Sequence, residues 1–451
     1  MPCKSCCDPR TFSIRVFGCQ MNVYDGNRLR NAMNSLGWRE VEDALDSDVA
    51  IFVTCSIRDK AEQKVVSELG RFRPQWERHG RPSVALVGCM AQRVGESVAR
   101  GFPWVKVVAG PRMLGAVPDS ITASADDGKI RIILSEDRGK MEDLHDIPLP
   151  RVNPHKAYVT IANGCDQFCS YCIVPYVRGK FKSREPDDIL NEINRLASAG
   201  TVEITLLGQN VNSYGKDFED GLEGYRFAPL LSDAASITGL KRLRFTTSHP
   251  IDFGADILDV MSSNRTGNIC PSINLPAQSG SDKVLLEMNR KYTREEYLRV
   301  VGMIRAAFPS AGLTTDLIVG FPGETGDEFL DSLSLLEEVR FDLVHSAAFS
   351  PREGTPAAAR TDQVPAAERA RRLTVINDVQ SGISKEINRS MEGLVCDVLL
   401  DEPAPRGEGL LQGRTVTDKV VLVRAPSEMT GEIRSVRILG STAWHLEGEL
   451  V

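Results

Sequence analysis

Residues 163–178 read Asn-Gly-Cys-Asp-Gln-Phe-Cys-Ser-Tyr-Cys-Ile-Val-Pro-Tyr-Val-Arg, and this stretch places three cysteines, Cys165, Cys169 and Cys172, at the spacing C-x3-C-x2-C. A structural zinc ion, or an iron–sulfur cubane held wholly by protein, takes four ligands. Three clustered thiolates with no fourth cysteine nearby leave one metal position open, where a substrate or cofactor can bind. From the residues alone, the alternative is a zinc or disulfide knuckle that borrows a histidine from elsewhere.

The composition is that of a globular chain with about three domains. The protein has 451 residues, of which 42% are hydrophobic and 25% charged, and its formal net charge is −7. This charge argues against nucleic-acid binding over the whole surface, so any RNA contact has to come from local basic patches. The apolar runs have strand length and the N-terminus lacks a signal peptide, so we expect no membrane segment and a cytoplasmic protein. Its 11 cysteines are then metal ligands or packed thiols rather than disulfides.

The segment from residue 12 to residue 150 is predicted to form an open parallel α/β sheet domain. Strand and helix patterns alternate in it, at residues 12–17, 24–36, 49–54, 59–72 and 84–87. Cys19, Cys55 and Cys89 each follow the end of a predicted strand. Ligands of a parallel sheet bind beyond the carboxyl ends of its strands, so we expect these cysteines to converge on a second three-thiolate site. One such cysteine alone would be interpreted as a small core residue.

The sequence around these cysteines carries a family resemblance. The matching segments are Phe17-Gly-Cys-Gln-Met-Asn22, Val53-Thr-Cys-Ser-Ile-Arg58 and Gly88-Cys-Met-Ala-Gln-Arg93. Together with the C-x3-C-x2-C loop they resemble the methylthiotransferase family of radical S-adenosylmethionine (SAM) enzymes, and within it the MiaB branch, over nearly the whole chain. The resemblance implies two [4Fe-4S] clusters: an auxiliary one on Cys19, Cys55 and Cys89, and a SAM-binding one on Cys165, Cys169 and Cys172.

The N-terminus departs from the family pattern. Cys3, Cys6 and Cys7 form an extra C-x2-C-C group, which we interpret as part of a tail spanning residues 1–11 rather than as a metal site.

Residues 151–385 are predicted to form a radical SAM partial (βα) barrel, whose chemistry takes place at the carboxyl ends of the strands. Polar or glycine-rich segments follow four of the predicted strands, at residues 208–212, 246–250, 276–281 and 320–324. An isolated residue among them, such as His249, is equally consistent with an ordinary loop. The resemblance implies that this mouth holds SAM, with Tyr171 near the adenine. Our candidates for the other contacts are Gly208, Gln209, Asn210, Gln278, Ser281 and Asp316.

Two basic regions are candidates for contact with RNA. Arg178, Lys180, Lys182 and Arg184 follow the cysteine loop; such runs are usually solvated faces, but this one adjoins the predicted active site. Residues 390–451 show short strand patterns that predict a small β-barrel similar to the TRAM domain, with which this family binds tRNA. Arg414 and Lys419 are the candidates there. The alternative is a purely structural barrel that caps the central domain.

The resemblance implies a methylthiotransferase that converts N6-isopentenyladenosine, just 3′ of the tRNA anticodon, into its 2-methylthio derivative. One SAM molecule would donate the methyl group and another would supply a carbon radical. A radical suits the reaction because the adenine C2 hydrogen is not acidic, and no catalytic acid or base is predicted. The implied partners are the tRNA anticodon stem-loop and an electron donor such as a flavodoxin or ferredoxin. We expect a monomer.

Other functions remain open at this point. Two branches of the same family modify an aspartate of a ribosomal protein or threonylcarbamoyladenosine in tRNA. From a different class, the chain could be a zinc-bearing RNA-binding protein without catalysis. If both clusters serve one reaction, the strand-end face of the first domain should cap the mouth of the barrel.

Overall fold

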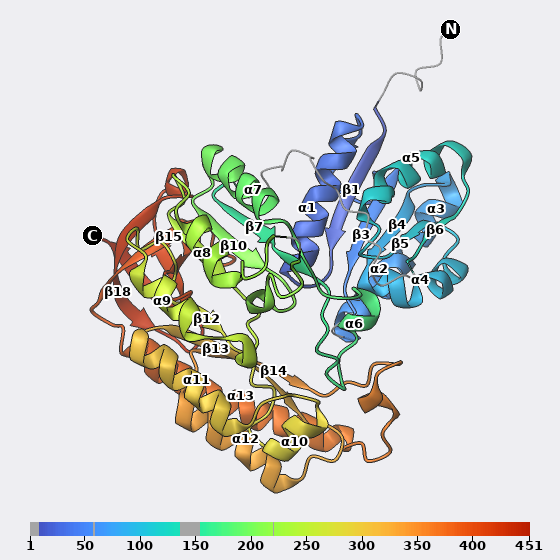
Figure 1. Ribbon diagram of the computed structural model, residues 1–451. Coiled ribbons are helices and arrows are strands. Elements are labelled where there is room, and N and C mark those ends of the chain that lie inside the picture. Colours follow the sequence, from blue (N-terminus) through green and yellow to red (C-terminus); the bar gives the residue numbers. More distant parts are fainter. Residues whose placement is uncertain (1–8, 57–58, 136–153, 220) are drawn as a thin grey trace. The chain divides into compact units, whose positions relative to one another are not determined.

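The structure is a computed structural model that describes residues 9–56, 59–135, 154–219 and 221–451 (Figure 1). Cys3, Cys6 and Cys7 lie outside these residues. The chain divides into two compact units, the first with Met1–Val152, Asn163–Phe168 and Cys172–Lys182, and the second with Asn153–Ala162, Cys169–Tyr171 and Ser183–Val451. The cysteine loop is therefore shared, since Cys165 and Cys172 belong to the first unit and Cys169 to the second.

The first unit is built on a six-stranded parallel sheet with the order β2-β1-β3-β4-β5-β6. The predicted parallel sheet is thus confirmed, although the sequence pattern indicated only three of its strands. Its strands are β1 (Thr11–Val16), β2 (Arg39–Glu40), β3 (Val49–Thr54), β4 (Ser83–Gly88), β5 (Val105–Ala109) and β6 (Arg131–Ile133). All six residues of β3 are buried because helices cover both faces of the sheet. That double coverage explains its uninterrupted apolar sequence.

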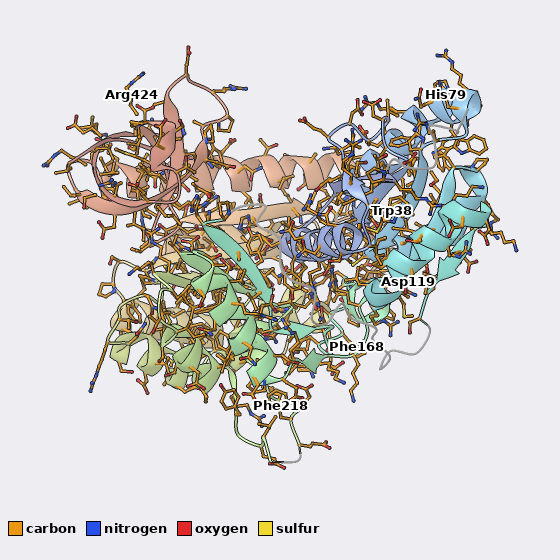
Figure 2. The ribbon with its side chains drawn as sticks, turned by 90° about the horizontal axis from the view of Figure 1, so that it is seen from above. Trp38, His79, Asp119, Phe168, Phe218 and Arg424 are labelled. Carbon is orange, nitrogen blue, oxygen red and sulfur yellow. The ribbon has the colours of Figure 1, made fainter. Side chains whose placement is uncertain are left out.

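Two apolar cores lie on the two faces of this sheet. Helices α1 (Gln20–Ser35) and α5 (Val117–Asp127) cover one face, where Trp38, labelled in Figure 2, is buried. Helices α2 (Asp59–Arg71) and α4 (Cys89–Gly101) cover the other face, and α3 (Arg73–His79) follows α2. Helix α1 begins four residues before the predicted residue 24, because it starts directly after Cys19, its N-cap residue. The short helix α6 (Val174–Val177), from the cysteine loop, also belongs to this unit.

The second unit contains six parallel strands of the central domain. They form two three-stranded sheets, β11-β10-β7 and β12-β13-β14, and an isolated parallel bridge from Leu243 to Ile269 extends the first sheet beyond β11. The bounds are β7 (Lys156–Thr160), β10 (Glu203–Leu207), β11 (Arg242–Phe245), β12 (Ser272–Asn274), β13 (Gly312–Val319) and β14 (Leu343–Ala348). The partial barrel that the sequence predicted is confirmed.

Helices alternate with these strands along the chain. They are α7 (Pro186–Ser198), α8 (Phe227–Ala235), α9 (Ala255–Ser263), α10 (Asp282–Glu287), α11 (Arg294–Ala307), α12 (Gly326–Val339) and α13 (Ala366–Arg389). Capping boxes fix the starts of α11 and α12, where Thr293 pairs with Glu296 and Thr325 with Glu328. The two-residue strands β8 (Ala162–Asn163) and β9 (Lys182–Ser183) pair with each other. In the described part of the chain, no helix combines the length and apolar character needed to cross a membrane.

The C-terminal segment closes into the predicted small β-barrel, in the order β15-β16-β17-β19-β18. Its strands are β15 (Val395–Pro403), β16 (Leu410–Thr415), β17 (Val420–Arg424), β18 (Ile433–Ser441) and β19 (Leu446–Leu450). Valine, leucine and isoleucine side chains fill the interior, among them Val398, Val421 and Val436.

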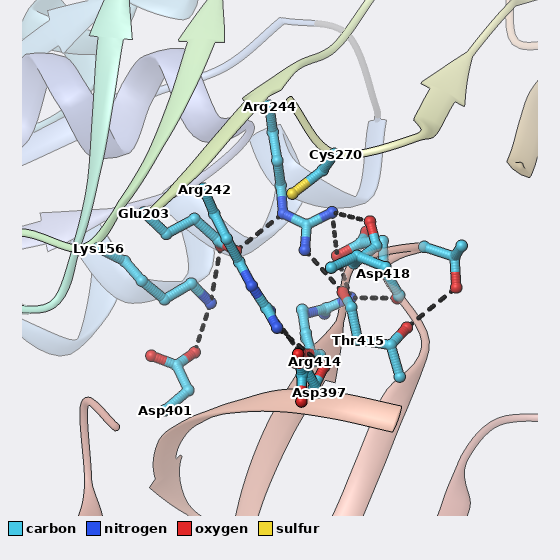
Figure 3. Close-up of polar contacts among 12 residues, drawn as sticks. Lys156, Glu203, Arg242, Arg244, Cys270, Asp397, Asp401, Arg414, Thr415 and Asp418 are labelled. Carbon is cyan, nitrogen blue, oxygen red and sulfur yellow. Dashed lines mark hydrogen bonds and ion pairs between the residues drawn. The ribbon is translucent and has the colours of Figure 1, made fainter. Parts of the chain in front are cut away.

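The barrel is attached to the amino-terminal ends of the central strands (Figure 3). Arg242, the first residue of β11, donates to the carbonyl oxygens of Arg414 at 2.7 Å and Asp397 at 2.8 Å. Arg244 donates to the carbonyl oxygen of Thr415 at 2.7 Å and forms an ion pair with Glu203 at 2.9 Å. The barrel therefore covers the end of the central domain opposite to the carboxyl ends of the strands.

Candidate active site

The three cysteines of the first unit lie at one edge of its sheet. Cys19 follows β1 and Cys55 follows β3, while Cys89 begins α4 directly after β4. Strands β1, β3 and β4 are neighbours in the sheet, so their carboxyl ends, and with them these residues, lie side by side. This is the arrangement that the sequence predicted, with each cysteine following the end of a strand.

Two glycines allow the backbone to approach closely at this edge. A Cβ atom on Gly18 would stand 2.6 Å from the Cβ atom of Cys55. Gly88 has a φ angle of +106°, and a Cβ atom there would stand 2.5 Å from the carbonyl oxygen of Thr54. No other residue type fits at either position without moving the neighbouring strand.

The surroundings of Cys19 favour the thiolate form, which is the form that binds iron. A hydrogen bond from Cys55 is the largest effect that lowers the pKa of Cys19, to about 5, and the charge of Arg178 and the backbone N–H groups of Asn22 and Met21 add to it. Burial raises the pKa of Cys89, and Arg178 opposes this rise. Cys19 and Cys89 also stand at the starts of helices α1 and α4, where the helix dipole stabilises negative charge.

The donor set fits an iron–sulfur cluster. Among the described residues, no three cysteine, histidine or acidic side chains stand close enough around one point to hold a single metal ion. In a cubane each cysteine binds a different iron, so its ligands stand further apart than those of one zinc ion. The eight cysteines that the structure describes form no disulfide. Three thiols beside a cation therefore fit the predicted auxiliary cluster.

Arg178 does not lie where the sequence analysis expected it. Its side chain is only 6% exposed and forms an ion pair with Asp25 of α1 at 3.2 Å. Ile173 and Val177, which precede Arg178 in the loop, pack against Cys89. Burial alone would lower the pKa of Arg178, but Cys89, Asp25 and Cys19 together raise it above its usual value. We therefore remove Arg178 from the proposed RNA contacts and place it at the auxiliary cysteines.

In the second unit, an arginine that the sequence analysis missed contacts Cys169. The Nη1 atom of Arg290 donates to Cys169 Sγ at 3.4 Å, and its Nε atom donates to the hydroxyl oxygen of Tyr292 at 3.0 Å. The neighbouring Ser170 is held in place by its hydroxyl group, which donates to the carbonyl oxygen of Glu287 at 2.8 Å. In the sequence, Arg290 comes shortly after α10 and looks like an exposed cation. Only the folded chain shows that it is buried.

Unpartnered polar atoms gather at the carboxyl ends of β10 and β11. Among the described residues, four buried side-chain atoms there have no hydrogen-bond partner: Gln209 Oε1, Asn210 Oδ1, Ser248 Oγ and His249 Nδ1. Buried polar atoms are rarely left unsatisfied, so a polar ligand at this place is the simplest explanation. Gln209 and Asn210 were predicted as SAM contacts, whereas Ser248 and His249 are additions from the structure. Burial, followed by the charge of Arg290, lowers the pKa of His249 to about 3, so its imidazole is neutral at pH 7.

The remaining predicted SAM contacts lie on neighbouring elements. Gln278, with a φ angle of +69°, donates its backbone N–H to the carbonyl oxygen of Asp316 at 2.8 Å. Asp316 lies within β13 rather than beyond its end, and its carboxylate accepts from Asn274 at 3.1 Å. Ser281 is the N-cap residue of α10, and Gly208 directly follows β10. Tyr171 packs against the apolar cluster that contains Phe321, Phe349 and Met288.

The predicted RNA contacts separate into exposed and paired residues. Lys180 and Lys182 are exposed. Arg184 is paired with Glu192 at 2.7 Å with its side chain 11% exposed. Lys419 is paired with Asp342, at the start of β14, at 2.7 Å, and Arg414 with Asp418 at 3.2 Å. Lys419 and Arg414 thus lie where the barrel meets the central domain, and Arg184 is held by Glu192, so we remove all three from the proposed RNA contacts.

Two exposed aromatic rings accompany the exposed lysines in the first unit. Phe168, labelled in Figure 2, and Tyr176 stand almost perpendicular to each other, with ring centroids 6.3 Å apart. Both rings are more than a third exposed. Aromatic faces next to cations are typical of surfaces that bind unpaired nucleotides.

Comparison with known proteins agrees with this architecture. Residues 159–336 match the model of the radical SAM superfamily, and residues 11–110 match the uncharacterized protein family UPF0004. Among solved structures, the radical SAM methyltransferase TsrM from Kitasatospora setae has a TM-score of 0.54 at 12% identity, with 77% of this chain and 75% of that chain covered. The cobalamin-dependent SAM radical enzyme OxsB has a TM-score of 0.51 at 11% identity, with 83% and 56% covered. At these identities the likeness concerns the fold alone.

Curated relatives cover almost the whole chain. A protein named tRNA-2-methylthio-N(6)-dimethylallyladenosine synthase from Acetivibrio thermocellus is 39% identical over 98% of this chain and 91% of its own length. Proteins of the same name from Moorella thermoacetica and Bacillus licheniformis are 39% and 40% identical over 98% of this chain, and 98% and 86% of their own lengths are covered. The resemblance found in the cysteine motifs is thereby confirmed. The chain belongs to the tRNA-2-methylthio-N6-dimethylallyladenosine synthase family of radical SAM methylthiotransferases.

Proposed function

We propose that this protein converts N6-isopentenyladenosine, next to the tRNA anticodon, into its 2-methylthio derivative. The observation that carries the proposal is identity near 39% over 98% of the chain to relatives named for this product. The two groups of three cysteines, each with an arginine beside one of its thiols, supply the ligands that two clusters would need. The alternatives are the family branches that act on threonylcarbamoyladenosine or on a ribosomal protein. The nucleoside analysis described below distinguishes them from this proposal.

Cys165, Cys169 and Cys172 would hold the cluster that binds SAM. When bound, such a cluster would supply the one-electron chemistry by which SAM becomes a source of hydrogen abstraction from an unactivated carbon. The chain's own residues orient the cofactor. Asn210, Ser248 and the neutral His249 present buried polar atoms to it. Arg290 holds Cys169 in place through a hydrogen bond to its sulfur atom.

Cys19, Cys55 and Cys89 would hold the auxiliary cluster, which supplies the inserted sulfur. Three thiolates leave one iron position for an exogenous or methylated sulfide. Gly18 and Gly88 keep the backbone close at this edge.

We further propose a protein of the cytoplasm that acts as a monomer, with a flavodoxin or ferredoxin as electron donor. Its modules would be the tail at residues 1–11, the methylthiotransferase domain at 12–150, the radical SAM domain at 151–385 and the TRAM-like barrel at 390–451. The reducing compartment fits six cysteines that serve as cluster ligands.

For contact with RNA we retain Lys180 and Lys182, with Phe168 and Tyr176 as stacking partners for unpaired bases. Replacing both lysines by alanine is expected to weaken tRNA binding about tenfold at low salt and to reduce the slope of log affinity against log salt concentration by about 1 to 2, because each phosphate contact contributes nearly one. Binding of an anticodon stem-loop, measured at several salt concentrations, checks this expectation. Arg340→Ala, which removes an exposed cation paired with Glu386 outside the cysteine loop and the barrel, is the matched control. An unchanged slope in the double-lysine variant would remove the loop from the interface.

Mass spectrometry of nucleosides tests the function itself. Cells that lack this protein are expected to contain isopentenyladenosine without its 2-methylthio derivative, and the gene supplied in trans restores the derivative. Intact 2-methylthio-isopentenyladenosine in the deleted strain would refute the proposal. Loss of the methylthio group from threonylcarbamoyladenosine, or from a ribosomal-protein aspartate, would instead assign the enzyme to the corresponding branch.

A further inference from the structure

The strongest unassigned feature is a buried pair of opposite charges beside the auxiliary cysteines. Arg178 and Asp25 stand 3.2 Å apart, with side chains 6% and 7% exposed. Arg178 follows Cys172 in the sequence after the short helix α6, whereas Asp25 belongs to α1, the helix that starts after Cys19. The pair thus joins the cysteine loop to the helix that follows an auxiliary ligand.

The packing around Arg178 fixes its position. Ile173 and Val177 of the loop pack against Cys89 in one buried cluster. The backbone N–H of Arg178 donates to the carbonyl oxygen of Val174 at 2.8 Å, and the backbone N–H of Cys165 donates to that of Gly179 at 3.2 Å. These contacts fix the backbone of the loop next to Cys89, and the charge of Arg178 acts on that thiol.

A cluster held by three thiolates carries negative charge, and this charge grows on reduction. A cation in a buried place next to such a group stabilises the reduced form more than the oxidised form, because burial weakens screening by water. A carboxylate at the same place has the opposite effect. Hydrogen bonds to cluster sulfur atoms and nearby charge are known determinants of cluster potentials.

We propose that Arg178 and Asp25 are positioning residues that set the reduction potential of the auxiliary cluster, with Arg178 raising it and Asp25 lowering it. The inference rests on the auxiliary cluster of the proposed function. Under this inference Arg178 acts on the auxiliary cluster rather than on RNA. A residue of the loop that carries the SAM-binding cysteines thereby influences the reduction potential of the sulfur-donating cluster.

The test uses the full chain with Cys165, Cys169 and Cys172 replaced by alanine, so that only the auxiliary cluster is loaded. Iron content is measured first, followed by a redox titration monitored by electron paramagnetic resonance. Arg178→Met is expected to disfavour reduction about tenfold, a midpoint shift of about −59 mV for one electron, and Asp25→Asn to favour it by a similar factor. Arg178→Lys, which keeps the charge, should stay within about threefold of the parent.

Arg30→Met is the matched control. Arg30 lies further along α1 and is paired with Glu40 at 2.8 Å, so its removal tests the loss of a partly buried ion pair away from the cysteines. Shifts of opposite sign for the two variants support the inference, and shifts of the same sign, or below about threefold, overturn it. If Arg178→Met loads no iron, a shift of more than about threefold toward reduction in Asp25→Asn, with Arg178→Lys within about threefold of the parent, supports the inference, and a smaller or opposite shift in Asp25→Asn overturns it. A parent chain without auxiliary iron would instead refute the cluster of the proposed function.

Discussion

Replacing Cys19, Cys55 and Cys89 together by alanine is expected to lower the iron content from about eight to about four per chain, because one of two four-iron clusters is lost. Methylthiolation should disappear, while reductive cleavage of SAM to 5′-deoxyadenosine continues. The two activities separate because Cys165, Cys169 and Cys172 are untouched and the removed cysteines hold only the sulfur source. Iron analysis of the anaerobically reconstituted enzyme, together with chromatography of deoxyadenosine and modified nucleosides, measures each effect.

The control for this variant is Cys396→Ala, which removes a partly exposed thiol from β15 of the barrel. It should keep both the full iron content and the modification activity. Full methylthiolation by the triple variant would show that the inserted sulfur does not come from this site. Loss of SAM cleavage along with methylthiolation would show that the two groups of cysteines do not act separately.

Replacing Arg244 by methionine is expected to destabilise the attachment of the barrel by about 3 to 5 kcal/mol. Arg244 and Glu203 have side chains 7% and 3% exposed and form an ion pair at 2.9 Å. Removing Arg244 takes away the nearest cation of the buried Glu203 carboxylate, which keeps only Arg242 and Lys156, each at 3.8 Å, and loss of a buried partner is costly. Arg244→Met also leaves the carbonyl oxygens of Thr415 and Val416 without their donor. Denaturant unfolding, and limited proteolysis near residue 390, measure the change.

Two further variants make the Arg244 experiment specific. Lys156→Met removes the ion pair with Asp401 at the same interface, where the lysine side chain is 23% exposed, and should cost about 1 kcal/mol or less. Adding Glu203→Gln to Arg244→Met should recover part of the loss, because the buried carboxylate that has lost its nearest cation is then replaced by a neutral amide. Equal unfolding free energies for Arg244→Met and the unaltered protein would show that these contacts do not hold the barrel.

The place of the barrel limits how a tRNA can use it. The barrel contacts the amino-terminal ends of β10 and β11, whereas the unpartnered polar atoms of Asn210, Ser248 and His249 lie at the carboxyl ends. β10 is five residues long, which spans about 16 Å at about 3.3 Å per residue. An RNA that touches both the barrel and the mouth must extend along the central domain over at least that length.

The sequence alone was sufficient for the features that depend on local pattern. The alternation of strands and helices predicted a parallel sheet, a partial barrel and a small β-barrel, and all three are present. The spacing of Cys165, Cys169 and Cys172 and the strand-end places of Cys19, Cys55 and Cys89 indicated two cluster sites. These features are readable because periodicity and ligand spacing are properties of neighbouring residues.

Only the tertiary structure decided the roles of the charged residues. Arg178 and Lys182 look alike in the sequence, yet Arg178 is buried against Asp25 and Cys89, while Lys182 is exposed. Lys419 lies between the barrel and Asp342, and Arg290 lies against Cys169. Whether a cation meets water, a carboxylate or a thiol depends on segments far away along the chain. Burial and pairing fix its energy, and neither can be read from the residues next to it.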